Sequence, residues 1–230
     1  MHAWQYWLDG AHSPALNMAL DEALLRYAGR SGVCVLRFYE WDRPSISIGY
    51  LQDYAAGERE GFAVVRRPTG GGVVFHDHDL TYTVAIPAEH WICGVDREAS
   101  YGHINHAVTS GLNQCNLDAG LTDATIPHSV ARRTMICFEN PTRYDIVLGG
   151  KKVAGAAQRR VREGILHQGS IHFGGPLPVS RHVLIDEIAA GFRRELDVEL
   201  TEFEPSAELF EEADKIAADK YATDRWNRKR

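Results

Sequence analysis

The 230-residue chain lacks the features that mark membrane-spanning and exported proteins. No apolar run approaches the roughly 18 residues that a transmembrane helix needs. The N-terminus, MHAWQYWLDG, has no basic segment followed by an apolar one, so we expect no secretory signal peptide. The four cysteines have no CxxC spacing, which argues against a zinc ribbon and, without an export signal, favours reduced thiols. These absences predict a cytoplasmic protein that does not insert into a membrane.

The common nucleotide-binding motifs are also absent. The glycine-rich stretch RRPTGGGVVFHD, residues 66–77, leads into an apolar strand pattern and has no Lys-Ser or Lys-Thr after it. It is therefore neither a Walker A loop nor a Rossmann fingerprint, both of which open a helix. The sequence contains no internal repeat, low-complexity tract or linker. We expect a single domain over residues 1–230, without a C-terminal accessory domain.

Positive charge is scarce overall but concentrated in one segment. The net charge is −6, which argues against a protein built to bind nucleic acid. Residues 132–162 nevertheless hold eight lysines and arginines against two acidic residues. This excess indicates either a basic face for an anionic ligand or acidic partner, or simply a solvated strand and hairpin region. Composition leaves both interpretations open.

Hydrophobic periodicity and turn residues predict an α+β protein. We expect strands at residues 4–8, 33–39, 45–50, 62–67, 73–77, 80–87, 143–148, 151–160, 165–173 and 198–203. We expect helices at residues 13–29, 98–115, 180–195 and 206–222, the first with Ser13 as N-cap, a loop at 118–134 and a frayed tail at 225–230. The strands around the glycine-rich stretch follow one another closely, so we expect them to be adjacent and antiparallel.

The three glycines at residues 70–72 need an explanation, because consecutive glycines cost backbone entropy and give the core nothing to pack. Their bare N–H groups, with Arg66 and Arg67 beside them, suit a phosphate or a carboxylate. A simple turn is the alternative. The stretch ends in His76 and Asp77, where structural hydrogen bonding competes with a role beside a ligand. The other histidines are scattered, so we expect no metal site.

A second motif, GGKKVAGAAQRR at residues 149–160, places Lys151 and Lys152 directly after a tight turn. Since strand side chains alternate, one lysine should point into the covered face of the sheet and the other to solvent. The small residues at 154–157 leave room for a ligand chain beside the buried lysine. They would equally allow a helix to pack closely.

Together, RRPTGGGVVFHD, GGKKVAGAAQRR and ILHQGSIHF, in this order, resemble the lipoate–protein ligase and octanoyltransferase family, which is related to the biotin ligases. SPALNMALDEALL and RFYEWDRPSISIGY match as well, so the resemblance covers residues 4–175. It implies a mixed, largely antiparallel sheet flanked by helices, as in biotin ligases and class II synthetase cores. It also implies an amide-forming reaction between a medium-chain acyl group and one lysine of a lipoyl domain.

The resemblance assigns roles to single residues. Lys152 matches the catalytic-site lysine, which would contact the acyl carbonyl or an adenylate phosphate. Cys137, in RRTMICFENPTRYDIVLGG, matches the nucleophile of the cysteine-dependent octanoyltransferases, and the nearby lysine would favour its thiolate. Without the resemblance, a cysteine after Met135 and Ile136 is equally typical of a buried position. The implied substrate-binding residues, lining the acyl tunnel and its carboxyl or phosphate end, are Arg67, Gly70, Gly71, Gly72, His76, Asp77, Gly155 and Ala156.

Octanoyl transfer through a Cys137 thioester is the leading hypothesis. The donor would be octanoyl acyl carrier protein, and the acceptor a lipoyl domain of a 2-oxoacid dehydrogenase or the glycine-cleavage H protein. Thioester transfer requires no cofactor. A monomer is the default expectation.

Three alternatives stay open. An ATP-dependent lipoate–protein ligase, using ATP and Mg, is favoured by Gly72, where cysteine-dependent members often carry arginine, and disfavoured by the lack of an accessory domain. A non-catalytic lipoyl-binding protein would keep the fold without the chemistry, but the retained Lys152, arginines and glycines argue against it. A biotin ligase ranks lowest, because its glycine- and arginine-rich ATP loop is not seen.

Overall fold

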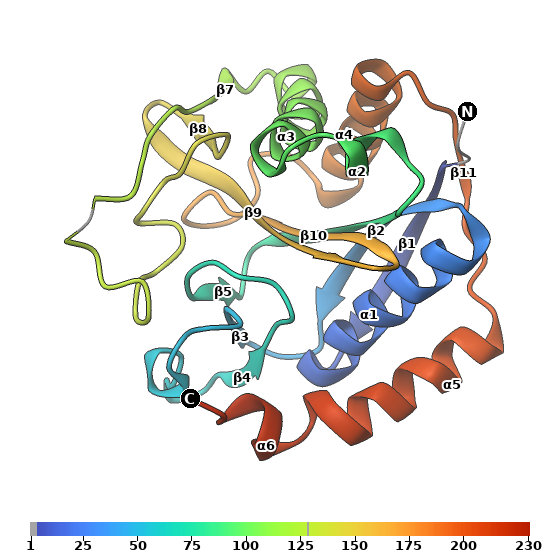
Figure 1. Cartoon of the computed structure of the whole chain (residues 1–230). Helices are drawn as coiled ribbons and strands as arrows, with labels where there is room; N and C mark the ends of the chain where they lie inside the picture. Colours follow the sequence, from blue (N-terminus) through green and yellow to red (C-terminus); the bar gives the residue numbers. More distant parts are fainter. Residues whose placement is uncertain (1–3, 128) are drawn as a thin grey trace.

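The computed structural model describes residues 4–127 and 129–230, which form two β-sheets and the helices that cover them (Figure 1). The strands are β1 (Trp4–His12), β2 (Cys34–Trp41), β3 (Ser45–Ile48), β4 (Ala63–Arg66), β5 (Val74–His76), β6 (Leu80–Pro87), β7 (Ala119–Leu121), β8 (Ile146–Leu148), β9 (Lys151–Val161), β10 (Gly164–Ile171) and β11 (Leu200–Glu202). The helices are α1 (Pro14–Ser31), α2 (Trp91–Gly94), α3 (Arg97–Gln114), α4 (Arg181–Leu196), α5 (Ala207–Ile216) and α6 (Asp224–Asn227), with a 3-10 turn at Tyr54–Ala56 and a π-helical turn at Ala217–Tyr221.

Among the described residues, the larger sheet has eight strands in the order β11-β1-β2-β6-β10-β9-β8-β7. β1 is parallel to β11 and β2, and the other neighbours are antiparallel. Helices α3 and α4 cover one face, whereas α1 lies against the other with α5 outside it (Figure 1). The side chains of β2 alternate between the two faces of this sheet. Leu36 and Phe38 pack in the core on the α3 and α4 side, and Val35 and Tyr39 pack in the core on the α1 side. The expected α+β class, with a mixed and largely antiparallel sheet, is confirmed.

The strands around the glycine-rich stretch do not form one antiparallel run, and that expectation is wrong. β4 and β5 both pair with β3 in a separate three-stranded sheet, whereas β6 belongs to the large sheet. Because β4 is parallel to β3 and β5 antiparallel to it, the chain must cross the end of β3 between them. Residues 67–73 make this crossing, so the stretch is a crossover loop and not a hairpin turn.

Helix α1 begins where the sequence predicts but ends later. The Ser13 hydroxyl accepts a hydrogen bond from the Leu16 N–H at 3.3 Å, which confirms the N-cap. The helix continues past Gly29 to Gly32, whose φ of 72° makes it the left-handed C-terminal cap. A Cβ on Gly29 would lie 3.0 Å from the carbonyl oxygen of Glu163. This glycine therefore allows the helix to pack closely on the β9–β10 turn.

The basic tail is not frayed, so that expectation is also wrong. The Trp226 indole donates to the Arg66 carbonyl at 2.8 Å, and the Asn227 amide oxygen accepts from the Arg66 N–H at 2.8 Å. The Arg66 guanidinium is buried and donates to the carbonyls of Asn227, Gly49 and Gln52. These bonds fix the C-terminal segment to β4 and direct Arg66 away from the glycines. No helix of the described part of the chain is long and apolar enough to cross a membrane.

Candidate active site

A cavity of about 440 Å³, including its mouth, lies between the two sheets and beside α1. Apolar and aromatic side chains form one part of its wall, namely Met18, Tyr39, Trp41, Val74 and Phe138. Small residues form another part, namely Gly155, Ala156, Ala157 and Gly169. The cavity crosses β9, β10, β6 and β2, which are consecutive in the sheet, so it extends over three strand spacings, or roughly 14 Å. This shape suits an unbranched apolar chain.

Most of the residues that the sequence indicated surround this cavity. Its lining includes Cys137, Arg67, Gly71, His76, Gly155 and Ala156. Lys152 reaches the same place by contacting Cys137. Gly70, Gly72 and Asp77 do not contribute to the lining. The motifs therefore converge on one site, although Lys152 and three of the expected substrate-binding residues stand outside its wall.

Cys137 and Lys152 are in direct contact at the β9 end of the cavity. The Lys152 Nζ lies 3.4 Å from the Cys137 Sγ and donates to the Cys137 carbonyl at 3.2 Å. The Lys152 side chain is only 2% exposed, whereas Lys151 is exposed, as the strand alternation predicted. Burial alone would lower the pKa of Lys152, but the charges of Cys137 and Asp145 outweigh burial, and the pKa is raised. Lys152 is thus a buried cation that is held beside the thiol.

The other three cysteines have surroundings of the opposite kind. All four thiols are free. Burial raises the pKa of Cys34, Cys93 and Cys115, so each is a poor nucleophile at neutral pH. Cys137 alone among the four lies against a buried lysine and lines the cavity.

The glycines serve the segment that carries Cys137. A Cβ on Gly72 would lie 2.7 Å from the Met135 carbonyl oxygen and 2.8 Å from the Cys137 N. The backbone of Val73 exchanges hydrogen bonds with both residues at 2.9 Å, which holds the segment against the loop. Gly71 has a φ of +87°, a conformation that favours glycine. The bare backbone at Gly72 therefore accommodates the segment that carries Cys137.

Arg67 stabilises the glycine loop through hydrogen bonds to its backbone. Its guanidinium donates to the carbonyls of Gly70 and Gly72 and to the carbonyl and hydroxyl of Ser47, with five hydrogen bonds in all. A guanidinium has five N–H donors, so none is left for a carboxylate or a phosphate. Burial lowers the pKa of Arg67, although an arginine stays charged in proteins. Arg67 thus contributes a fixed positive charge near Cys137 and no free donor.

His76 has a carboxylate partner, but it is not Asp77. The His76 Nδ1 lies 2.8 Å from an Asp79 oxygen and its Nε2 lies 2.8 Å from the Ser47 hydroxyl. Burial raises the pKa of Asp79, but the His76 charge and hydroxyl donors outweigh burial and hold it low. Trp41 stacks on the imidazole at 4.0 Å, whereas Asp77 is exposed. The structure favours hydrogen bonding for His76, and no group of three metal-ligating side chains occurs within the described ranges.

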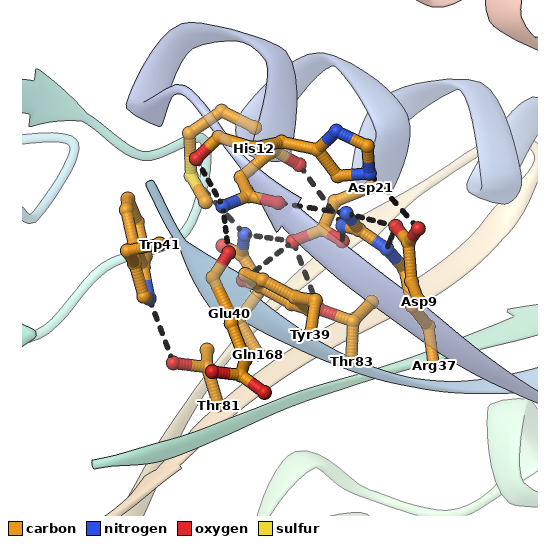
Figure 2. A network of polar contacts seen from close by, with 12 residues as sticks. Asp9, His12, Asp21, Arg37, Tyr39, Glu40, Trp41, Thr81, Thr83 and Gln168 are labelled. Atoms are coloured by element: carbon orange, nitrogen blue, oxygen red, sulfur yellow. Dashed lines mark hydrogen bonds and ion pairs between the residues drawn. The ribbon is translucent and has the colours of Figure 1, made fainter. Parts of the chain in front are cut away.

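A buried polar network that sequence reasoning missed connects α1 to the cavity (Figure 2). Asp21 accepts from Arg37 at 2.7 Å, from the Thr83 hydroxyl at 2.8 Å and from the Gln168 amide at 2.7 Å. Gln168 lines the cavity and accepts from the Thr69 hydroxyl at 2.7 Å, which ties the network to the glycine loop. Burial raises the pKa of Asp21, opposed by Arg37 and the hydrogen bonds. The sequence did hold one sign of this network, since Asp21 is a charged residue on the largely apolar, buried face of α1.

The fold and the site define a class of protein: an α+β core with a largely apolar cavity that ends at a cysteine in contact with a buried lysine. The chain belongs to the lipoyl protein ligase A/B catalytic domain family, whose pattern matches residues 13–198. The curated octanoyltransferase LipM of Anoxybacillus flavithermus is 32% identical over 273 aligned residues, covering 99% of this chain and 98% of that one. The octanoyltransferase LipM of Bacillus subtilis is also 32% identical, over 276 residues and with the same coverage.

Solved structures share the fold. A lipoate protein ligase structure from Thermoplasma acidophilum with bound lipoic acid has a TM-score of 0.83 at 23% identity and covers 99% of both chains. A lipoate-protein ligase A bound with ATP has a TM-score of 0.80 at 23% identity and covers 98% of both chains. At this identity the likeness concerns the fold alone.

Proposed function

We propose that the protein is an octanoyltransferase of protein lipoylation, which works through a thioester on Cys137. The observation that carries the proposal is the 3.4 Å contact between the Cys137 thiol and the buried Lys152 ammonium at one end of the cavity. Curated relatives that are named octanoyltransferases, and that align with this chain over nearly their whole length, support it. The donor is octanoyl acyl carrier protein and the acceptor is a lysine of a lipoyl domain or of the glycine-cleavage H protein.

In the first half-reaction, the Cys137 thiolate attacks the carbonyl carbon of the carrier's octanoyl thioester. A new C–S bond forms to Cys137, and the bond to the carrier's sulfur breaks as the tetrahedral intermediate collapses. The carrier leaves as a thiolate and takes a proton from water, which balances the proton that Cys137 lost. The Lys152 ammonium faces the negative charge that develops on the carbonyl oxygen.

In the second half-reaction, the neutral amine of the acceptor lysine attacks the Cys137 thioester. The C–N bond of the amide forms, the C–S bond breaks, and the amine releases one proton to water. Cys137 returns as a thiolate beside Lys152, ready for the next donor. The small residues Ala156 and Ala157 line the cavity and leave space for the acyl chain next to this pair.

The proposal includes no cofactor, because the donor thioester is already activated. A ligase would need ATP and Mg to activate a free acid. The ligase-like Gly72 does not favour that alternative, since close packing of the Cys137 segment explains it. A lipoate protein ligase of Thermoplasma acidophilum has been solved in a study with its E2 lipoyl domain, which supports a lipoyl domain as acceptor here. We further propose that the enzyme acts as a monomer in the cytoplasm.

The decisive experiment incubates the protein with octanoyl carrier protein, without ATP or acceptor, and records its intact mass. We expect a gain of one octanoyl group that hydroxylamine removes and that Cys137→Ala abolishes. The control is Cys115→Ala, which should acylate normally because burial raises the pKa of Cys115. If the protein gains no octanoyl group, and an acceptor is modified only when lipoate and ATP are present, the proposal fails.

A further inference from the structure

Asp145, which the sequence did not single out, lies directly behind Lys152. Its Oδ2 accepts a hydrogen bond at 2.6 Å from the Lys152 Nζ, the same atom that lies 3.4 Å from the Cys137 thiol. The same oxygen accepts from the N–H of Thr142 at 2.6 Å and from its hydroxyl at 2.9 Å. The side chains of Lys152 and Asp145 are only 2% and 5% exposed. The ammonium is therefore held between a thiol and a carboxylate that is itself fixed.

The backbone before Asp145 is held in an unusual conformation. Tyr144 has a φ of +67°, which is uncommon for an aromatic residue. Its N–H donates to the Thr122 carbonyl and its carbonyl accepts from the Asn105 amide, both at 2.7 Å. Strained residues of this kind persist only when the surroundings fix them, and they cluster at functional sites. Asn105 on α3 and Thr122 directly after β7 thus fix Tyr144, and with it the position of the Asp145 carboxylate.

Gly155 makes room for the ion pair. A Cβ at this position would lie 2.5 Å from the Lys152 Cε, 2.7 Å from its Nζ and 3.0 Å from an Asp145 oxygen. Distances below 3.0 Å are not compatible with a real Cβ, so any larger residue would push the lysine away. Strand β9 thus leaves a space that the Lys152–Asp145 pair fills.

We propose that Asp145 is a positioning residue that fixes the Lys152 ammonium against Cys137 and completes a Cys137–Lys152–Asp145 triad. A lysine stem is flexible, and a buried carboxylate that pairs with its tip selects one conformation and keeps it charged. The nucleophile, its activating group and an orienting third group then form the arrangement common in covalent catalysis. The inference rests on the proposed function for the role of Cys137, and it deepens that function.

The test measures the reactivity of Cys137 and needs no acyl donor, so it is independent of the octanoyl reaction. Iodoacetamide alkylation of Cys137 is followed by peptide mass against pH in the native protein, Asp145→Ala, Lys152→Met and the double variant. If Lys152 loses its anchor in Asp145→Ala, the alkylation midpoint should rise by about one pH unit, which is about tenfold in rate at neutral pH. The double variant should show no rise beyond that of Lys152→Met, since Asp145 acts through the lysine.

The opposite sign would overturn the proposal. If Asp145 acted only as a nearby negative charge, its removal would lower the midpoint, because a repulsive charge would be gone. An undiminished effect of Asp145→Ala in the Lys152→Met background would also overturn it. Arg67, whose charge also acts on Cys137, is unchanged in every variant. If alanine impairs folding, Asp145→Asn keeps the shape without the ion pair and should give a smaller rise of the same sign.

Discussion

At the scale of single residues, one of the four thiols differs from the others because a buried ammonium lies next to it. Cys34 is fully buried without such a partner, and burial raises its pKa. Cys137 is half-buried and lies 3.4 Å from Lys152. The difference depends on the position of one amino group, so changes that move this group by an ångström should affect catalysis more than stability.

Gly155→Ala tests that sensitivity. The added methyl group would lie 2.5 Å from the Lys152 Cε, and the end of a lysine side chain can move where backbone cannot. We therefore expect octanoyl transfer to fall by on the order of a hundredfold, with the melting temperature nearly unchanged. Turnover and thermal unfolding check this. Gly120→Ala is the matched control, because nothing lies within 4 Å of its Cβ, and near-normal turnover by Gly155→Ala would contradict the packing argument.

His167 should make the folded state sensitive to acid. Burial lowers its pKa from an ordinary 6.5 to about 3, so the unfolded chain takes up a proton between these values and the folded protein does not. The stability that neutral His167 provides is complete above pH 6.5 and is lost as pH falls towards 3. At pH 5 the loss should be roughly 2 kcal/mol, at about 1.4 kcal/mol per pH unit.

Urea unfolding at pH 7.5 and pH 5 measures this loss. The comparison is His167→Gln, which is less stable at both values because it disturbs the contact with Gln158, a hydrogen bond of 3.0 Å. Between pH 7.5 and pH 5, the unfolding free energy of this variant should fall by about 2 kcal/mol less than that of the native protein. An equal pH dependence in both proteins would show that His167 is not the titrating group.

The sequence predicted the acyl-site residues better than it predicted their partners. Strand alternation, a local property, predicted that one of Lys151 and Lys152 is buried, and the family resemblance predicted that Lys152 lies near Cys137. Asp145 and Asp79 were missed, although they lie only seven and three residues from their partners, because the sequence pattern does not show which nearby carboxylate turns towards the site. The sequence named His76 and Asp77 together as candidates, whereas Asp79 is the carboxylate that His76 contacts.

At the scale of elements, the crossover loop between β4 and β5 shows why short strands mislead. A parallel pair and an antiparallel pair have the same local pattern of apolar residues, so the sequence could not show that both strands flank β3. The sequence indicated that residues 70–72 have to be glycines, but it did not show which neighbour requires this. Met135 and Cys137 come 63 and 65 residues after Gly72 in the sequence, and only the tertiary structure reveals that they pack against it.

Gly72→Ala and Gly70→Ala separate steric need from simple loop flexibility. The Gly72 methyl group would meet the backbone of Met135 and Cys137 at 2.7–3.0 Å, and backbone cannot yield cheaply. We expect Gly72→Ala to lose about 1–3 kcal/mol of stability and to slow acylation of Cys137. Gly70→Ala has nothing within 4 Å and should keep both properties nearly intact. Thermal unfolding and acyl-enzyme formation check the pair, and equal behaviour of the two variants would refute the steric argument.

At the scale of the whole molecule, the basic segment at residues 132–162 is not one continuous cationic face. Most of its cations have local partners: Arg133 pairs with Asp53, Arg143 with Glu98, Lys152 with Asp145 and Arg162 with Glu163, while Arg160 binds backbone carbonyls of α2 and its C-terminal flank. Arg132 and Lys151 are exposed, and among the described residues neither has a carboxylate partner. Composition could count these charges but could not show which are neutralised.

Arg132 and Lys151 stand close in sequence to Cys137 and Lys152, so they are suited to attract an acidic carrier to the site. Reversing both charges with Arg132→Glu and Lys151→Glu should raise KM for octanoyl carrier protein and leave kcat nearly unchanged. The rise should be largest at low ionic strength, because salt of about 0.15 M already screens exposed charges beyond about 8 Å. A small uncharged octanoyl thioester should react equally well with both proteins.

The matched control is Arg193→Glu with Arg225→Glu, which changes the net charge equally at exposed sites on α4 and α6. If docking depends on local charge, this control keeps the native KM, since steering acts through the field near the cavity. If both double variants weaken carrier use to the same extent, only net charge matters. If neither does, or if the small thioester is affected as strongly as the carrier protein, the exposed cations have no part in donor recognition.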